Sequence, residues 1–523
     1  MPHTITAWSA RIATDPIDEH HAIKEHRGIK CRKSIEFLSH SVSTQSTDLS
    51  FCTGTGEGLL TNYILPDLES ARWEVIFVTC FWSSKSKSRL ALCESLKRLS
   101  EKAVARREPG SQKKVTVHIC ISSVSLWQKL CHTTSLHGHV YNEKEWTRKL
   151  KLPAAEEIPG IDLHVKSIFI RPFSVMHPKF MIVDRQFVWV PSCNVSWENW
   201  YEGGIRLTGN TVKSFYEFWV EVWAAHASKD PKSGAPADWK GWEGPLPPLM
   251  EPTPLRKRMS SGVEYGPAAV PGRFIPSFYD TNSQTTEGEA LQAAKKPDPI
   301  PTLFLPSSHH RDPRFRPGSF REARAEPRTP LNAYTAYLLS KAKTHVYIQT
   351  ANVTGKPILR GILGCLKEGV NVTIVTNNRL MRLEQIVTAG STTECSVKWL
   401  VREYEKLRLQ TEGDSAATAG GEATLDDRKP PGHLKISYWK PNVTGPRGQS
   451  VPPAFDMSHL KLTIVDKEVT ILGSGNMDRA SWYTSQELGI ALYSKVVAEK
   501  IWKEVVARDV ARNAKQVYPP STS

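Results

Sequence analysis

A histidine, a lysine two residues later and an aspartate seven residues later occur together twice in this chain, around His177 with Lys179 and around His459 with Lys461. In extended backbone, residues two apart point to the same side, so each copy presents an imidazole beside an ammonium group. An aspartate follows each histidine by seven residues, a serine by fifteen and an asparagine by seventeen, namely Asp184, Ser192, Asn194 and Asp466, Ser474, Asn476. Ammonium and amide groups hold phosphate oxygens while a histidine reaches phosphorus. Two such copies supply one histidine to attack and another to protonate the leaving oxygen.

The elements that must position these residues also repeat. Each copy is preceded by an amphipathic helix, an apolar β-branched strand, a second helix and two further strands. Each copy is followed by a similar stretch, Glu202–Leu207 in the first and Glu487–Leu492 in the second, and then by another amphipathic helix. The sequence therefore predicts an internal duplication of two α/β halves. The expected elements cover 59–68, 73–82, 87–102, 115–121 and 161–170 in the first half, and 331–343, 345–350, 357–369, 370–375 and 436–439 in the second.

A change in composition separates the halves. Residues 244–330 contain 16 of the 36 prolines, which is typical of an extended linker. A short strand is expected within it at 302–305, and residues 411–432 have the small, polar composition of a disordered surface loop. The resulting division is an N-terminal extension at 1–50, a first half at 51–243, a linker at 244–300, a second half at 301–515 and a tail at 516–523.

Charge and cysteine usage limit the class of protein. The net charge is +15 at neutral pH, which favours an anionic partner such as nucleic acid, an anionic membrane surface or a phosphate-bearing substrate. The nine cysteines are scattered without a C-x-x-C pair, which argues against a disulfide framework and a zinc site. With neither a signal peptide nor a membrane-spanning run in the sequence, we expect a cytoplasmic protein or one peripheral to a membrane.

The two copies resemble the paired H-x-K-x-x-x-x-D motifs of the phospholipase D superfamily, over about residues 50–240 and 300–512. The resemblance implies two α/β sandwich halves, with mixed sheets flanked by helices, related by a pseudo-two-fold axis. It implies one active site at the junction of the halves and catalysis through a phosphohistidine, without metal or other cofactor. Because both motifs lie in one chain, a monomer is expected.

The resemblance also assigns roles to residues. His177 resembles the nucleophile, and His459 the general acid that later acts as base. The lysines and asparagines of the two copies would hold the non-bridging phosphate oxygens, with Ser192 and Ser474 beside them. Asp184 and Asp466 are expected to be structural. Glu487 and Glu202 match the downstream acid that hydrogen-bonds a histidine and fixes its tautomer.

Two departures affect the first copy. Pro191 precedes its serine where the second copy has Gly473, and Glu202 lies 25 residues after its histidine whereas Glu487 lies 28 after its own. Three functions remain open. The leading hypothesis is a phosphodiesterase or phosphatidyltransferase acting on phospholipid at an anionic membrane surface, similar to phospholipase D or cardiolipin synthase. The others are a nuclease of the same superfamily and a catalytically inactive phosphate-binding scaffold.

Overall fold

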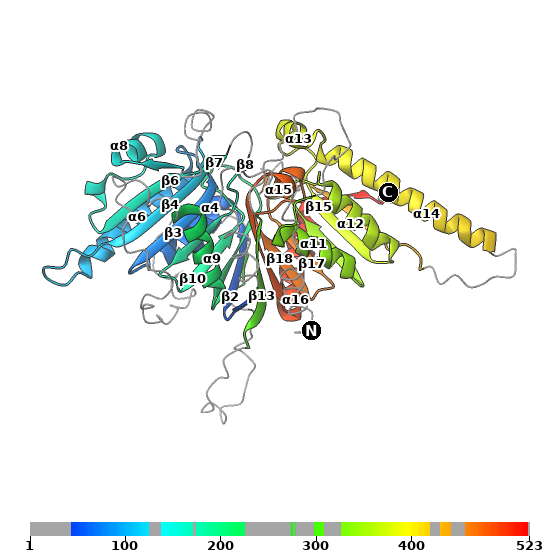
Figure 1. Ribbon diagram of the computed structural model, residues 1–523, viewed down its shortest axis with the longest axis horizontal. Helices are drawn as coiled ribbons and strands as arrows, with labels where there is room; N and C mark the ends of the chain where they lie inside the picture. Colours follow the sequence, from blue (N-terminus) through cyan, green and yellow to red (C-terminus); the bar gives the residue numbers. More distant parts are fainter. Residues whose placement is uncertain are drawn as a thin grey trace, which may run out of the picture. The chain divides into compact units, whose positions relative to one another are not determined.

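The protein divides into two compact units, each built on one nine-stranded mixed sheet with helices on both faces (Figure 1). The computed structural model describes residues 43–124, 138–170, 174–224, 273–275, 278, 298–307, 326–418, 429–440 and 455–520. Unit 1 comprises Met1–Ser43, Ile170–Pro178 and Leu303–Ser523, and unit 2 comprises Thr44–Phe169 and Lys179–Thr302. The predicted α/β class with two mixed sheets is confirmed.

The sheet of unit 2 joins a parallel part to an antiparallel part. Strands β3, β4 and β6 run parallel, and β9, β10, β11, β2 and β12 continue the sheet as antiparallel neighbours from the other side of β3. In order across the sheet the strands are β12 (Arg273–Ile275), β2 (Leu49–Gly54), β11 (Glu202–Thr208), β10 (Phe187–Pro191), β9 (Phe180–Val183), β3 (Glu74–Phe81), β4 (Val115–Ser123), β6 (Ile161–Ser167) and β5 (His139–Tyr141).

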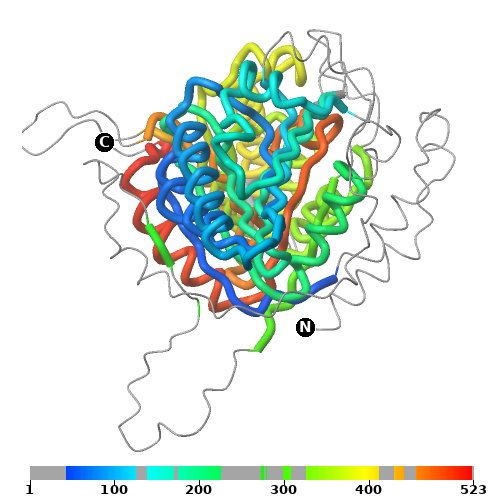
Figure 2. Tube along the Cα trace, turned by 90° about the vertical axis from the view of Figure 1, so that its left-hand side faces the viewer, coloured from blue at the N-terminus to red at the C-terminus, as the bar shows by residue number. Residues whose placement is uncertain are grey.

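Helices bury both faces of this sheet, which explains why its central strands read as unbroken apolar runs. Helix α6 (Lys87–Ala105) lies along one face, where it is one of the blue helices of Figure 2, and packs with Val75 and Phe77 of β3. Helix α9 (Thr211–Trp219) covers the other face, where Phe215 stacks edge-on against Phe180. The remaining helices of unit 2 are α4 (Gly56–Leu59), η1 (Leu60–Ile64), α5 (Leu65–Leu68), α8 (Glu143–Glu145), η2 (Trp146–Leu150), η3 (Ala155–Glu157) and η4 (Val220–Ala224).

The sheet of unit 1 repeats this order. Its central strand β14 is parallel to β15 on one side and antiparallel to β17 on the other. In order across the sheet the strands are β1 (Ser43–Ser46), β13 (Ile300–Ser307), β19 (Glu487–Tyr493), β18 (Val469–Gly473), β17 (Leu462–Val465), β14 (His345–Gln349), β15 (Asn371–Thr376), β16 (Leu434–Trp439) and β20 (Ala514–Tyr518). Because β14, β15, β17, β18 and β19 take the places of β3, β4, β9, β10 and β11, the predicted duplication holds at the level of topology.

The helices of unit 1 begin and end where local chemistry requires. Helix α11 (Pro330–Lys341) starts with proline at its first position, as predicted, and the Thr329 hydroxyl caps it by accepting a hydrogen bond from the Asn332 backbone. Helix α12 (Lys356–Lys367) packs beside it over the buried Val346 and Ile348. The other helices are α13 (Arg382–Ala389), α14 (Thr393–Thr418), α15 (Arg479–Tyr483), α16 (Lys495–Ile501), η7 (Trp502–Val510) and α17 (Ala511–Asn513).

Several predicted segments differ in the structure or lie outside its described part. Helix α14 continues to Thr418, so the disordered loop predicted at 411–432 is wrong for residues 411–418. Extending an existing helix costs far less than starting one. Residues 419–428, the first 42 residues and most of the predicted linker lie outside the described residues, although β12 and the start of β13 fall within the linker range.

A tight turn ends each motif strand. Asp184 and Arg185 both have positive φ, and the Gln186 backbone N–H donates to the Val183 carbonyl, which defines a type I′ hairpin turn between β9 and β10. Asp466 and Lys467 form the same turn between β17 and β18.

The aspartate of each turn anchors the start of the strand beside the motif hairpin, which is β3 for Asp184 and β14 for Asp466. The Asp184 carboxylate accepts hydrogen bonds from the backbone N–H groups of Arg72, Trp73 and Glu74, at 2.8 to 2.9 Å. Asp466 accepts in the same way from Lys343, Thr344 and His345, at 2.8 to 3.0 Å. This geometry ties the motif hairpin to the strand beside it.

Removing the Asp184 side chain should therefore destabilise unit 2. The Asp184→Ala variant leaves three partly buried N–H groups without this acceptor and puts alanine at positive φ, so the free energy of unfolding should fall by about 3 kcal/mol. Asp184→Asn should lose less, because asparagine tolerates positive φ and keeps one acceptor oxygen. Urea unfolding measures both, with the half-exposed Asp162→Ala as the control. A loss no larger than the control's would contradict the anchoring role.

Candidate active site

Both motif histidines lie in the segment just before a strand. His177 and Lys179 precede β9, and His459 and Lys461 precede β17, so neither pair lies within a strand. A local constraint explains the first case, because Met176 forms a bridge with Gln486 instead of continuing into β9. His177, His459 and Lys461 belong to unit 1, and Lys179 belongs to unit 2.

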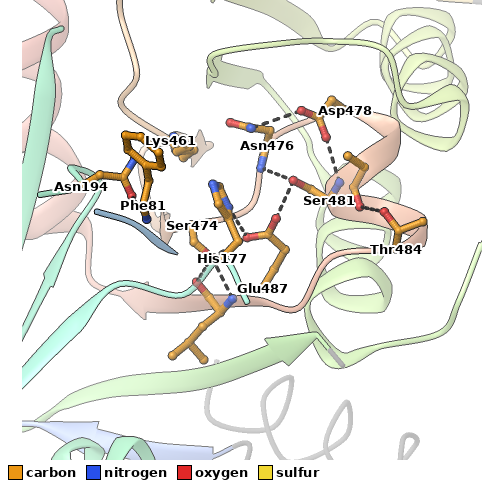
Figure 3. Close-up of polar contacts among 12 residues, drawn as sticks. Phe81, His177, Asn194, Lys461, Ser474, Asn476, Asp478, Ser481, Thr484 and Glu487 are labelled. Carbon is orange, nitrogen blue, oxygen red and sulfur yellow. Dashed lines mark hydrogen bonds and ion pairs between the residues drawn. The ribbon is translucent and has the colours of Figure 1, made fainter. Parts of the chain in front are cut away.

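The side chain of His177 forms a hydrogen bond with Glu487. The Nδ1 atom of His177 lies 2.8 Å from Oε2 of Glu487, and the two are drawn at the centre of Figure 3. Two backbone hydrogen bonds hold the histidine in register: the His177 N–H donates to the Gln486 carbonyl, and the Gln486 N–H donates to the Val175 carbonyl. The histidine is thus fixed by the residue that directly precedes Glu487 as well as by Glu487 itself.

Glu487 is a buried carboxylate, and both of its oxygens accept hydrogen bonds. The Ser474 hydroxyl donates to Oε2 at 2.5 Å, and the Ser481 hydroxyl donates to Oε1 at 2.7 Å. Burial opposes ionisation, but the charge and the hydrogen bond of His177, together with the two serine hydroxyls, outweigh it and lower the pKa of Glu487. Glu487 is therefore an anion at neutral pH, able to accept a proton-bearing Nδ1.

A second buried carboxylate, Asp478, organises the turn that carries Asn476. Asp478 caps α15 by accepting from the Ser481 backbone at 2.8 Å, and it accepts from the Asn476 side-chain amide at 3.2 Å. The Asn476 backbone N–H in turn donates to the Ser481 hydroxyl at 3.1 Å (Figure 3). Burial raises the pKa of Asp478, and the nearby charge of Glu487 adds to this. Sequence reasoning missed Asp478 and Ser481, although an aspartate three residues before a serine at a helix start is a recognisable cap.

The segment before β17 is held by side chains that the sequence did not single out. The Ser458 hydroxyl accepts from the Gln349 side chain at 2.8 Å, and Asn377 bonds both the N–H and the carbonyl of Ser458, at 3.0 and 2.8 Å. His459 is buried, and the Lys461 ammonium donates to its carbonyl at 2.8 Å. Seven of the predicted site residues therefore belong to unit 1, namely His177, His459, Lys461, Asp466, Ser474, Asn476 and Glu487.

Unit 2 carries the matching half of the motif. The Ser192 hydroxyl donates to the buried Glu202 in a short hydrogen bond and accepts from the Gly203 N–H at 2.9 Å. In unit 1 the Ser474 hydroxyl likewise donates to Glu487 and accepts from the Leu488 N–H at 3.0 Å. Lys179 is buried, and the Asn194 side chain accepts from the Phe81 N–H at 3.2 Å.

The two departures noted in the sequence do not change this local arrangement. The longer spacing to Glu487 accommodates α15, and both serines still donate to their glutamate. Pro191 lies opposite Gly204, and Gly473 lies opposite Gly489. Gly473 has φ of +152°, and a Cβ atom there would lie 2.3 Å from the Leu488 carbonyl oxygen, so unit 1 requires glycine at this position.

Two further features of the described residues complete the geometry. A small cavity of about 30 Å³ is lined by Lys461, Asn476 and Ser481 among others, and the buried Oδ1 of Asn476 has no hydrogen-bond partner within the described ranges. Over those same ranges, His, Cys, Asp and Glu side chains form no group of three or more that suits a metal ion. None of the helices described has both the length and the apolar character needed to cross a membrane.

Part of the chain matches a known protein family. Residues 336–508 match a family model described as cardiolipin synthase, PLD-like domain. No curated protein matches the sequence.

Solved structures of low sequence identity also align with the chain. A phosphatidylserine synthase of Haemophilus influenzae Rd KW20 aligns over 94% of this chain and 92% of its own, with 13% identity and a TM-score of 0.48. Nuc of Salmonella typhimurium, a phospholipase D family member, aligns over 36% of this chain and 90% of its own, with 15% identity and a TM-score of 0.24. NucT of Helicobacter pylori aligns over 33% and 82%, with 15% identity and a TM-score of 0.21.

Proposed function

We propose, on the premise that the chain belongs to the phospholipase D superfamily through residues 336–508, that it cleaves or exchanges phosphodiester bonds of phospholipids through a phosphohistidine. Within this proposal His177 is the nucleophile and His459 is the general acid and base. The single observation that carries the proposal is the hydrogen bond between His177 Nδ1 and the buried Glu487.

That hydrogen bond supports a nucleophilic role because it selects the tautomer of His177. An ionised Glu487 accepts a hydrogen bond and cannot donate one, so the Nδ1 atom must carry a proton. The lone pair of neutral His177 is then on Nε2, the nitrogen on the far side of the ring from Glu487. After attack on phosphorus the ring becomes cationic, and the adjacent carboxylate stabilises that charge.

The proposed reaction has two displacement steps. In the first, Nε2 of His177 forms a bond to phosphorus, the bond from phosphorus to the alcohol oxygen breaks, and protonated His459 gives its proton to that oxygen. In the second, water or another alcohol attacks phosphorus and passes its proton to His459, and the bond between nitrogen and phosphorus breaks. Hydrolysis and transfer differ only in which hydroxyl enters.

The phosphate oxygens need cationic and amide donors during both steps. Lys461 and Asn476 in unit 1 are our candidates, and Lys179 and Asn194 in unit 2 carry the same residue types. We keep Ser474 and Ser192 as supporting residues, since each of their hydroxyls donates to a glutamate. For unit 1, the contact of Asn476 with Asp478 supports a fixed amide orientation.

Phospholipid is the substrate class we favour. The net charge of +15 suits an anionic membrane surface, where each exposed lysine or arginine contributes about 1 kcal/mol of attraction. The same charge suits nucleic acid, so nucleic acid is the competing substrate in the test.

Turnover of defined substrates by the purified chain tests this proposal. Vesicles of mixed zwitterionic and anionic phospholipid, single-stranded DNA and double-stranded DNA are each incubated with the protein, in parallel reactions with and without EDTA. We expect release of the lipid head group, or its exchange when an alcohol is added, without loss of rate in EDTA. Cleaved DNA with intact lipid would overturn the lipid substrate, and activity abolished by EDTA would overturn the metal-independent mechanism.

A further inference from the structure

Helix α13 in unit 1 has its amphipathic character reversed. It buries a polar side chain, Gln385, and leaves three large apolar side chains in solvent: Leu383 is 81% exposed, Val387 51% and Ile386 46%. These three residues are separated by three and four positions, so they share one face of the helix. Met381, directly before the helix, is 43% exposed. A helix that packs only for stability would turn these residues inward.

Polar contacts fix this orientation. The Gln385 amide donates to Asn352 at 2.9 Å and to the Leu380 carbonyl, and its oxygen accepts from the Thr393 backbone N–H at 2.6 Å. All four residues are buried. Rotating the helix to bury Leu383 would break each of these hydrogen bonds and leave buried polar groups unpaired. The apolar face is therefore held outward by the fold.

The exposed face has basic residues at its edge and lies near the candidate active site within unit 1. Arg379 and Arg382 are exposed, and Arg382 forms a 3.7 Å ion pair with Glu394. Helix α13 contacts α15, the helix that follows Asn476, and the Arg479 guanidinium donates to the Thr388 carbonyl at 3.3 Å (Figure 1). The exposed apolar patch, made of Met381, Leu383, Ile386 and Val387, therefore lies on a helix that contacts the segment following Asn476.

The small area of the patch indicates what kind of partner it can bind. A stable interface with a second protein needs about 800 Å² on each partner, far more than four side chains on an eight-residue helix provide. A short helix with a few apolar side chains and flanking arginines is suited to the headgroup layer of an anionic membrane, where the apolar face enters the acyl boundary. Arg379 and Arg382 suit the negative charge of such a surface, against which the exposed Glu384 of the same helix acts.

We propose that α13 is a membrane-docking helix, with Met381, Leu383, Ile386 and Val387 inserting into an anionic phospholipid surface beside the candidate active site. This inference rests on the proposed function, because it assigns the lipid surface as the place where that site meets its substrate. It adds the element that binds the surface.

Vesicle sedimentation with the full chain tests the proposal. The Leu383→Ser/Val387→Ser double variant should bind phosphatidylcholine vesicles containing phosphatidic acid at least about tenfold more weakly than the wild type. The control is Leu409→Ser/Val496→Ser, which removes two exposed apolar side chains, 65% and 55% exposed, from other helices of unit 1. The control should bind as the wild type does. Both variants should turn over bis(p-nitrophenyl) phosphate, a soluble phosphodiester, at the wild-type rate.

The outcomes separate this inference from the proposed function. Equal vesicle binding by the α13 variant and the wild type, with lipid turnover intact, would overturn the docking helix and leave the enzyme proposal standing. A wild type that binds vesicles through α13 but turns over no lipid would support the docking helix and overturn the lipid reaction. A dimeric wild type that becomes monomeric in the α13 variant would assign the patch to a contact between two copies and overturn membrane docking.

Discussion

Replacing His177 by alanine should lower kcat on a phosphodiester substrate by about ten-thousandfold or more, because the variant lacks the atom that forms the covalent intermediate. The fold should survive, since the histidine ring is partly exposed and its main-chain hydrogen bond to Gln486 does not need the side chain. Initial rates measured with excess substrate, alongside circular dichroism and thermal unfolding, check both statements.

The control is His433→Ala, which removes an exposed histidine of unit 1 outside the site. Its rate should equal that of the wild type. Loss of activity in both variants would point to a general effect of histidine removal. A His177→Ala protein that keeps more than about a tenth of the wild-type rate would exclude His177 as the nucleophile.

Replacing Glu487 by glutamine should lower kcat by about a hundredfold to ten-thousandfold while changing KM little. Glutamine has nearly the same volume, and its one oxygen can still accept from one of the two serine hydroxyls, but it carries no charge to stabilise a cationic His177. It can also donate to Nδ1, which would favour the tautomer with its proton on Nε2 and block attack. Glu487 is therefore a positioning residue, which acts through His177.

The pH dependence of stability tests whether folding lowers the pKa of Glu487. The pKa of folded Glu487 is lowered, so its carboxylate contributes stability that is present above the unfolded pKa of about 4.3 and is lost as the pH falls through the folded value. Glutamine does not titrate in this range. The difference in unfolding free energy between the wild type and Glu487→Gln should therefore shrink below about pH 4. A difference that stays constant into acid would mean that folding does not lower the pKa of Glu487.

Much of the fold could be predicted from the sequence because its central strands are buried on both faces. Runs such as Val75 to Cys80 and Val346 to Ile348 are apolar and β-branched or aromatic, and a strand is the favoured structure for a short run of this kind. Pro330 marked the start of α11 for a similarly local reason. The residues with matched spacing could also be selected from sequence, since the duplication removes most chance pairings.

The parts that could not be predicted depend on contacts between distant residues. Asp478 and Ser481 matter because α15 folds back toward Glu487, which residue spacing alone does not indicate. The short edge strand β20 forms by pairing with β16, about 80 residues earlier, and its own sequence is weakly apolar. Helix α13 is the clearest case, because its apolar pattern indicates a buried face, and only the contacts of Gln385 show that the face points outward.

The covalent intermediate is the most direct measurement of the central claim. Protein quenched in alkali during turnover of a labelled phospholipid, digested and examined by mass spectrometry, should carry the phosphatidyl group on the peptide that contains His177. In His459→Ala, which lacks both the acid of the first step and the base of the second, the adduct should form more slowly and also decay more slowly. An adduct on the His459 peptide would contradict the assignment of His177 as nucleophile. Full turnover with no adduct on any histidine peptide would contradict it as well.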